Sequence, residues 1–300
     1  MYLRTTPGHN WIRERRIVRP SELGAPPIDW DSYRQVPGRG ALAAAASFVD
    51  KTLVIAELEV RKLRHDATEL LTRAVQPALW LVIFGEVLSQ MRAVPTGEVR
   101  YIDFVAPGIL AQSVLFIAIF YGISTIWERD LGVVHKFMAT PTPRAALVLG
   151  KALSAGVRAL SQAVIIYLLA VVLGVNVNWS LPALLGVVLV VILGAAAFST
   201  FSLIIACLVR TRERFMGIGQ VLTMPMFFAS NAIYPITIMP HWLQIASRLN
   251  PLTYQVDALR ALMLPGFTIT YGVGMDVVIL VVVVAVLVMV AERLYPRLVE

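Results

Sequence analysis

Charged residues are scarce in this 300-residue sequence, and their scarcity decides the class of protein. They make up 15% of the chain, whereas hydrophobic residues make up 58% and the mean hydropathy is +0.73. Because a soluble protein has about 25% charged residues, this composition excludes an ordinary soluble domain. It indicates an integral membrane protein.

Several kinds of functional site are also missing. Cys207 is the only cysteine, which excludes an intramolecular disulfide and a cysteine metal cluster, and the four histidines show no ligand spacing. No GxxxxGK[ST], GxGxxG or HExxH motif occurs, and the apolar runs hold no carboxylate pair and no Ser/His/Asp set. We therefore expect no catalytic residue, metal or cofactor on this chain. If nucleotide drives it, a partner subunit binds the ATP and magnesium.

Six apolar runs approach the roughly 20 residues that the hydrocarbon core requires. They predict an all-α integral membrane protein whose transmembrane domain (residues 74–300) has six transmembrane helices, at residues 74–90, 107–127, 157–175, 181–208, 217–234 and 275–292. A polar arm (1–40) and an amphipathic interfacial helix (41–73) precede the domain; the alternative for the latter is a soluble helix packed on the arm. The small residues of 194–202, GAAAFSTFS, predict close approach of another helix.

The basic residues predict the orientation. The net charge is +7, which in a soluble chain would suggest nucleic acid as a partner. Here the basic residues gather in the arm, in the segment 128–144, in the VRTRERF loop (209–215) and in the C-terminal tail. The positive-inside rule places those parts, and both termini, in the cytoplasm. No nucleic-acid partner is expected.

The segment ERDLGVVHKFMATPTPR, residues 128–144, interrupts two apolar runs. Leu131, Val134 and Met138 recur at i, i+3 and i+7, which predicts one stripe of a short helix. Pro141 and Pro143 then end that helix. We interpret the segment as an amphipathic helix at the cytoplasmic face that a partner can bind. The alternative is a basic loop that only fixes topology.

The apolar region 216–264 is too long for one span and too short for two. Its prolines predict one span followed by short helices that dip back into the membrane on the outer side. Asp257 and Arg260 are three residues apart, a spacing at which side chains on a helix meet. With Asn250 and Pro251 before them, they predict a fixed polar brace.

Three charged residues lie within or beside the predicted spans. Glu86, in the first span, is interpreted either as a substrate-pathway or helix-pairing residue or as one that reaches the outer interface. Lys151 and Arg158, seven residues apart, are expected to meet lipid phosphate or the partner.

Two segments resemble those of type-2 ATP-binding-cassette (ABC) transporter permeases, which include bacterial drug, lipid-linked saccharide and nodulation-factor exporters. They are ERDLGVVHKFMATPTPRAALVLGKAL (128–153) and FFASNAIYPITIMPHWLQIASRLNPLTYQVDALRALML (227–264). The resemblance covers about residues 53–294 and leaves the arm unmatched.

The resemblance implies a role for each segment. The first corresponds to the coupling helix that docks on the ATPase, between spans 2 and 3, and the implied docking residues are Glu128, Arg129, Asp130, Leu131, Gly132, Val134, His135, Lys136, Met138, Pro141 and Arg144. The second corresponds to outer re-entrant helices between spans 5 and 6 that close the exit, with Asn231, Tyr234, Pro235, Pro240, Asn250, Pro251, Tyr254, Asp257 and Arg260 as the implied gate.

These observations predict the permease subunit of an ABC exporter in the plasma (inner) membrane of a bacterium. It would move an amphipathic drug or lipid-linked molecule, with a separate ATPase and a second permease copy, identical or paralogous, as partners in the lipid bilayer. A polysaccharide exporter of the O-antigen or teichoic-acid kind is the alternative. A stand-alone secondary transporter or channel would need coupling ionisable groups at mid-membrane, and a membrane-bound transferase would need paired acid and base groups.

Overall fold

The computed structural model describes residues 99–138, 143–209, 211–266 and 271–298, together with residues 50, 54, 57, 72, 75–85 and 87. All of these belong to the unit Ala46–Glu300. Every regular element among them is a helix, so the predicted all-α class is confirmed for this part of the chain. The predicted arm (1–40) and nearly all of the predicted interfacial helix (41–73) lie outside the described residues.

Four described helices are long and apolar enough to cross a membrane. They are α5 (Tyr101–Asp130), α7 (Arg144–Val172), α8 (Leu181–Leu208) and α12 (Val273–Leu294), which continues into the 3-10 turn η4 (Tyr295–Leu298). The predicted span at 181–208 coincides with α8, and three others overlap α5, α7 and α12. These four predictions are confirmed as apolar helices.

The other two predicted spans are described only in part or are shorter than expected. Residues 75–79 are α-helical and continue into the π-helical segment η2 (Trp80–Gly85). Helix α9 (Arg212–Phe228) has 17 residues and ends before residue 234, where the predicted fifth span ends. The count of six spans therefore stays a prediction.

Helix α5 is the centre of the packing. It contacts η2, α7, α8, α9 and α11, and every residue from Tyr101 to Leu115 is buried. Helix α12 is its opposite, because only Asp276, Leu280, Val288 and Ala291 are buried there. Its exposed valines (Val278, Val281, Val282, Val286 and Val290) form an outward apolar surface of the kind that lipid covers in a membrane.

Small residues set the closest contacts between helices. A Cβ atom on Gly194 of α8 would lie 2.2 Å from the side-chain nitrogen of Gln255 in α11 (Pro251–Met263), so a larger residue would force the Gln255 amide to move. Residues 194–200 are all buried. The close packing predicted for the tract 194–202 is therefore confirmed. A Cβ on Gly108 of α5 would lie 2.2 Å from the carbonyl oxygen of Ala232.

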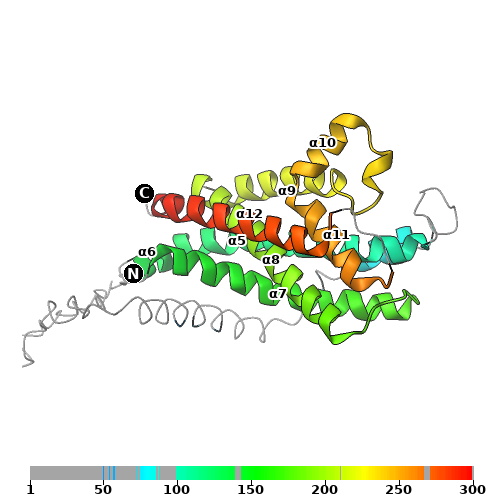
Figure 1. Ribbon diagram of the computed structural model, residues 1–300. Coiled ribbons are helices and arrows are strands. Elements are labelled where there is room, and N and C mark those ends of the chain that lie inside the picture. Colours follow the sequence, from blue (N-terminus) through cyan, green and yellow to red (C-terminus); the bar gives the residue numbers. More distant parts are fainter. Residues whose placement is uncertain are drawn as a thin grey trace, which may run out of the picture. The chain divides into compact units, whose positions relative to one another are not determined.

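The described helices have two distinct ends. Helix α6 (Val133–Met138) and the C-terminal end of α12 lie at one end, and α10 (His241–Leu249) and α11 lie at the other (Figure 1). We call these the α6 end and the α10 end. Pro235, Pro240 and Pro251 break the region 216–264 as predicted, because the 3-10 turn η3 (Ile236–Ile238), α10 and α11 begin there. Pro225 lies inside α9 and does not end it.

Candidate functional site

The α6 end presents an exposed leucine in a tight turn. Helix α5 ends at Asp130, and Gly132 turns the chain into α6 with a φ of +70°, a conformation that favours glycine. Leu131, in this turn, is 71% exposed, and Lys136 in α6 is also exposed. This turn therefore offers a partner an apolar contact next to a positive charge.

Val134 faces the opposite way. It is fully buried in a cluster with Leu147 of α7, Leu203 of α8 and Tyr295 and Leu298 of η4. The predicted stripe of Leu131 and Val134 on one docking face is therefore wrong: Leu131 precedes α6 in a turn, so the helical periodicity does not hold across it. Val134 anchors α6 to the spans.

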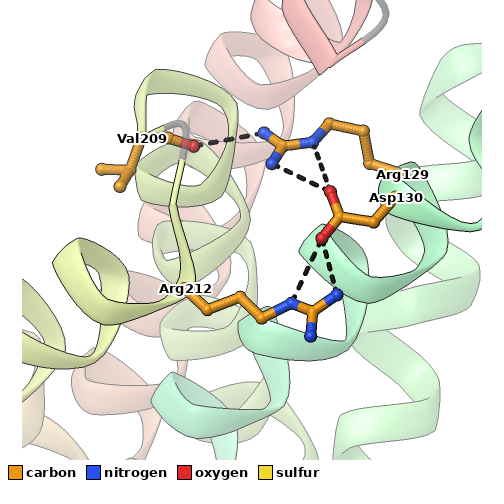
Figure 2. Close-up of polar contacts among 4 residues, drawn as sticks. All are labelled: Arg129, Asp130, Val209 and Arg212. Carbon is orange, nitrogen blue, oxygen red and sulfur yellow. Dashed lines mark hydrogen bonds and ion pairs between the residues drawn. The ribbon is translucent and has the colours of Figure 1, made fainter.

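An acidic residue joins α5 to α9 next to the exposed turn. The Asp130 carboxylate accepts hydrogen bonds from Arg212 of α9 at 2.7 and 3.2 Å and from the neighbouring Arg129 at 3.2 and 3.3 Å (Figure 2). Arg129 also donates to the carbonyl oxygen of Val209 at 3.4 Å. The Arg212 guanidinium lies 3.8 Å from the ring centroid of Trp127, a cation–π distance. These contacts hold the start of α9 against the end of α5.

A second ion pair joins α5 to α7. Lys151 Nζ lies 2.6 Å from a Glu128 oxygen and donates to Thr125 Oγ1 at 3.1 Å, and both charged side chains are largely buried. The sequence predicted that Lys151 would meet lipid phosphate or the partner. Instead, Lys151 pairs with Glu128 inside the protein. Arg158 lies over the ring of Tyr121 at 5.1 Å.

At the α10 end, Asn250 begins α11. Its side-chain oxygen accepts a hydrogen bond from the Leu252 backbone nitrogen at 3.0 Å, as an N-cap does, and Pro251 follows at the first helical position. The side-chain nitrogen donates to the carbonyl oxygen of Met226 at 2.6 Å. One amide thus caps α11 and fastens it to α9.

Arg260 fixes α11 to α5 and to the turn after α9. It is 2% exposed, donates to the carbonyl oxygens of Phe104 at 3.2 Å and Asn231 at 2.9 Å, and lies 3.7 Å from the ring centroid of Phe104. The nearby charge of Asp257 opposes the cost of burying the Arg260 guanidinium. Asp257 in turn accepts a hydrogen bond from the Tyr271 backbone nitrogen at 3.1 Å.

The other predicted gate residues lie around this brace. Tyr234 and Tyr254 each close a local loop, with hydroxyl groups donating to the carbonyl oxygens of Phe228 at 2.5 Å and Arg248 at 2.6 Å. Pro235 and Pro240 directly precede η3 and α10. The structure thus brings all the predicted gate residues to one end of the protein.

Some residues of the predicted docking and pathway sites lie outside the described part of the chain. Glu86 and Pro141 are not among the described residues, and neither are the side chains of His135 and Met138. Arg144 is the first residue of α7 and is exposed. The roles assigned to these residues remain predictions.

A cavity that the sequence analysis missed lies between the spans. It has a volume of about 460 Å³, within the range typical of small-molecule sites. Residues of the first predicted span, α5, α7 and α9 line it, among them Gln76, Gln112, Gln162 and Gln220. One sequence signal pointed to it: each of these four glutamines lies within a predicted span, where an uncharged polar side chain needs a partner.

Comparison with known proteins places these features in a family. Residues 51–264 match the model of the ABC-2 type transporter family. The chain is 28% identical over 217 residues to a putative transport permease, ycf38, of Cyanophora paradoxa, covering 72% of this chain and 74% of that protein. It is 25% identical to the daunorubicin resistance ABC transporter permease protein DrrB1 of Streptomyces coeruleorubidus, covering 77% of this chain and 81% of that one.

A third relative is nodulation protein J of Rhizobium leguminosarum bv. trifolii, 27% identical over 65% of this chain and 74% of that one. Members of this family are multi-pass transmembrane subunits without catalysis of their own, and the family implies partnership with an ABC ATPase. Because the family model covers more than two thirds of the sequence, the chain belongs to the ABC-2 type transporter permease family.

Proposed function

We propose that this chain is the permease of an ATP-driven exporter that carries an amphipathic molecule outward across the plasma membrane of a bacterium. A separate ATPase binds ATP and magnesium and docks on the permease, and two permease copies form the pathway. The family, and the drug-resistance relatives within it, support this proposal.

The charges support an assignment of the α6 end to the cytoplasm. Among the described arginines, those near the ends of the spans divide unequally between the two ends. The positive-inside rule puts the richer end inside. The α6 end holds Arg129, Arg144, Arg212, Arg214, Arg293 and Arg297, whereas the α10 end holds Arg100, Arg248 and Arg260.

The ATPase docks on the turn between α5 and α6. Leu131 supplies an exposed apolar anchor there, and truncating such an anchor at a protein interface commonly costs about 2 kcal/mol or more. Lys136 and Arg144 supply surrounding charge. Val134 does not contact the partner, since it is buried against α7, α8 and η4, where it holds α6 in place.

One observation carries the coupling mechanism. Asp130 joins the end of α5 to the start of α9, immediately before Leu131, and α5 and α9 both line the cavity. A displacement of the docked turn therefore moves two walls of the cavity together. Glu128 and Lys151 extend the linkage to α7, which supplies a third wall.

The cavity is the proposed cargo site, and the α10 end is the proposed gate. Arg260 and Asn250 join α11 to α5, α9 and the turn after α9. Helix α11 and the parts of α5 and α9 at the α10 end therefore form one braced unit. Opening the exit requires this unit to move relative to the rest, which is a rigid-body change of the kind that switching proteins use.

The proposal is tested by ATP hydrolysis in proteoliposomes. The purified chain alone should hydrolyse no ATP above background, and hydrolysis should appear when the ATPase from its own operon or organism is added. Hydrolysis by the isolated chain, free of contaminating ATPase, would contradict the separate-partner mechanism. Unchanged ATP hydrolysis and transport in a double variant, Leu131→Ala with Asp130→Ala, would contradict docking of the ATPase at this turn.

A further inference from the structure

The cavity between α5, α7 and α9 is lined by four primary amides. Gln76 comes from the first predicted span, Gln112 from α5, Gln162 from α7 and Gln220 from α9. Gln112 and Gln162 are buried, with exposures of 3% and 0%, whereas Gln76 and Gln220 are exposed. The cavity thus has a buried amide floor and an exposed amide rim.

The two floor amides lie at similar depth. Gln112 is eleven residues after Tyr101, the first residue of α5, and Gln162 is ten residues before Val172, the last residue of α7. At 1.5 Å per residue both lie about 15–17 Å from the α10 end of their helices. This is near the middle of a hydrocarbon core about 30 Å thick, where polar groups need a partner supplied by protein, water or ligand.

The Gln112 carbonyl oxygen has no hydrogen-bond partner in the part of the chain that the structure describes. Buried polar atoms in proteins are nearly always hydrogen-bonded, so each exception calls for an explanation. Because this oxygen belongs to a residue that lines a cavity of about 460 Å³, a hydrogen-bond donor on a bound molecule would satisfy it.

Apart from Thr72 and Ser113, the remaining lining is apolar and adaptable. The rings of Phe116 and Phe120 on α5 have centroids 6.1 Å apart, and Met216 and Met224 of α9 also line the cavity. Methionine side chains adjust to irregular apolar shapes. A ligand therefore meets both an apolar wall and a set of amides.

We propose that the amides of Gln112 and Gln162 make this cavity select amphipathic molecules whose polar side carries neutral hydrogen-bonding groups, such as hydroxyl, amide or sugar groups. This inference rests on the proposed function of the cavity as the cargo site. A primary amide donates and accepts hydrogen bonds, so it replaces the water that a hydroxyl or amide loses on binding. It carries no charge with which to offset the desolvation of an ion.

The test measures occupancy of the cavity without any ATPase. The full chain carries Cys207→Ser and Met224→Cys, so that the reporter thiol lies in the cavity lining, and is held in lipid nanodiscs. Reaction of the thiol with N-ethylmaleimide is followed by mass spectrometry. The probes are decyl β-D-glucoside and decyltrimethylammonium, which share one alkyl chain, at concentrations that leave the nanodiscs intact.

The glucoside should protect the thiol at a concentration at least about fivefold lower than the ammonium compound does. Gln112→Met, which keeps the side-chain length and removes the amide, should raise the half-protecting glucoside concentration about five- to tenfold, the equivalent of one buried hydrogen bond. It should leave protection by the ammonium compound unchanged. Gln220→Met, at the exposed rim where folding is not at risk, should shift the glucoside in the same direction by less.

Gln255→Met is the matched control, because Gln255 is equally buried but packs on Gly194 outside the cavity. It should change neither probe. Equal protection by the two probes, or unchanged glucoside protection in both Gln112→Met and Gln220→Met, would overturn the amide selectivity while leaving the cavity as a binding site. Protection by neither probe would overturn the cavity assignment itself, yet ATPase docking at Leu131 would be untouched by that result.

Discussion

Replacing Arg260 by methionine should destabilise the permease by about 3–5 kcal/mol, the range seen when one partner of a buried charged network is removed. Arg260 is 2% exposed and makes hydrogen bonds of 2.9 and 3.2 Å to the carbonyl oxygens of Asn231 and Phe104. Hydrogen bonds to charged groups are worth about 1.5–3 kcal/mol each. The contact with the Phe104 ring at 3.7 Å adds up to about 2 kcal/mol.

Two terms limit the gross sum. The guanidinium no longer has to be desolvated in the variant, and methionine fills much of the volume, which favours the variant. Against this, the charge of Asp257 loses the compensating cation that Arg260 supplies. The net loss is therefore smaller than the sum of the contacts but well above the effect of a surface substitution.

The measurement is denaturant unfolding in mixed micelles, followed by tryptophan fluorescence. Arg248→Met is the matched control: Arg248 lies on α10 and its side chain is exposed, so the change should stay within about 0.5 kcal/mol. Arg260→Lys should fall between the two, because a lysine cannot reproduce the planar fork of donors. If Arg260→Met were as stable as Arg248→Met, Arg260 would not hold α11 to α5.

Two further predictions concern the ion pair between Asp130 and Arg212 and the topology of the chain. Asp130→Arg should lower coupled transport, and adding Arg212→Asp should restore a large part of it, because the ion pair is re-formed with reversed charges. Transport into vesicles at equal ATPase content measures both effects. No recovery in the double variant would argue against coupling through this pair. In a cysteine-free background, cysteine at position 178 should react with impermeant maleimide only from outside, and cysteine at position 214 only from inside. Labelling of both from the same side would contradict the topology.

The sequence predicted well those features that depend on one chain segment. The uninterrupted apolar run 181–208 forms α8, because a segment of this length and composition can satisfy its backbone hydrogen bonds inside a membrane only as a helix. The tract beginning at Gly194 became a close helix contact, because small residues permit it wherever a neighbour arrives. The start of α11 at Asn250 is also local, through the capping of backbone donors, but the sequence analysis assigned Asn250 only to a polar brace.

The features that the sequence did not reveal depend on pairs of segments. The periodicity that joined Leu131 to Val134 assumed one continuous helix, and the turn at Gly132 separates the two side chains. Lys151 was expected at the surface because its partner, Glu128, lies 23 residues away in the sequence. The cavity required four glutamines from separate helices to meet, and no local pattern encodes that meeting.

The central claim is that a separate ATPase docks on the turn between α5 and α6, and its affinity for Leu131 variants tests this most directly. Leu131 is 71% exposed, so Leu131→Ser should leave the fold intact. Loss of a 2 kcal/mol anchor corresponds to about a 30-fold weaker affinity. Lys136→Ala should weaken binding by about fivefold at most, since an exposed charge contributes about 0 to 1 kcal/mol. Binding of the ATPase to the permease in nanodiscs should therefore weaken about 30-fold in Leu131→Ser and far less in Lys136→Ala. An unchanged affinity in Leu131→Ser, at equal permease content, would contradict docking at this turn.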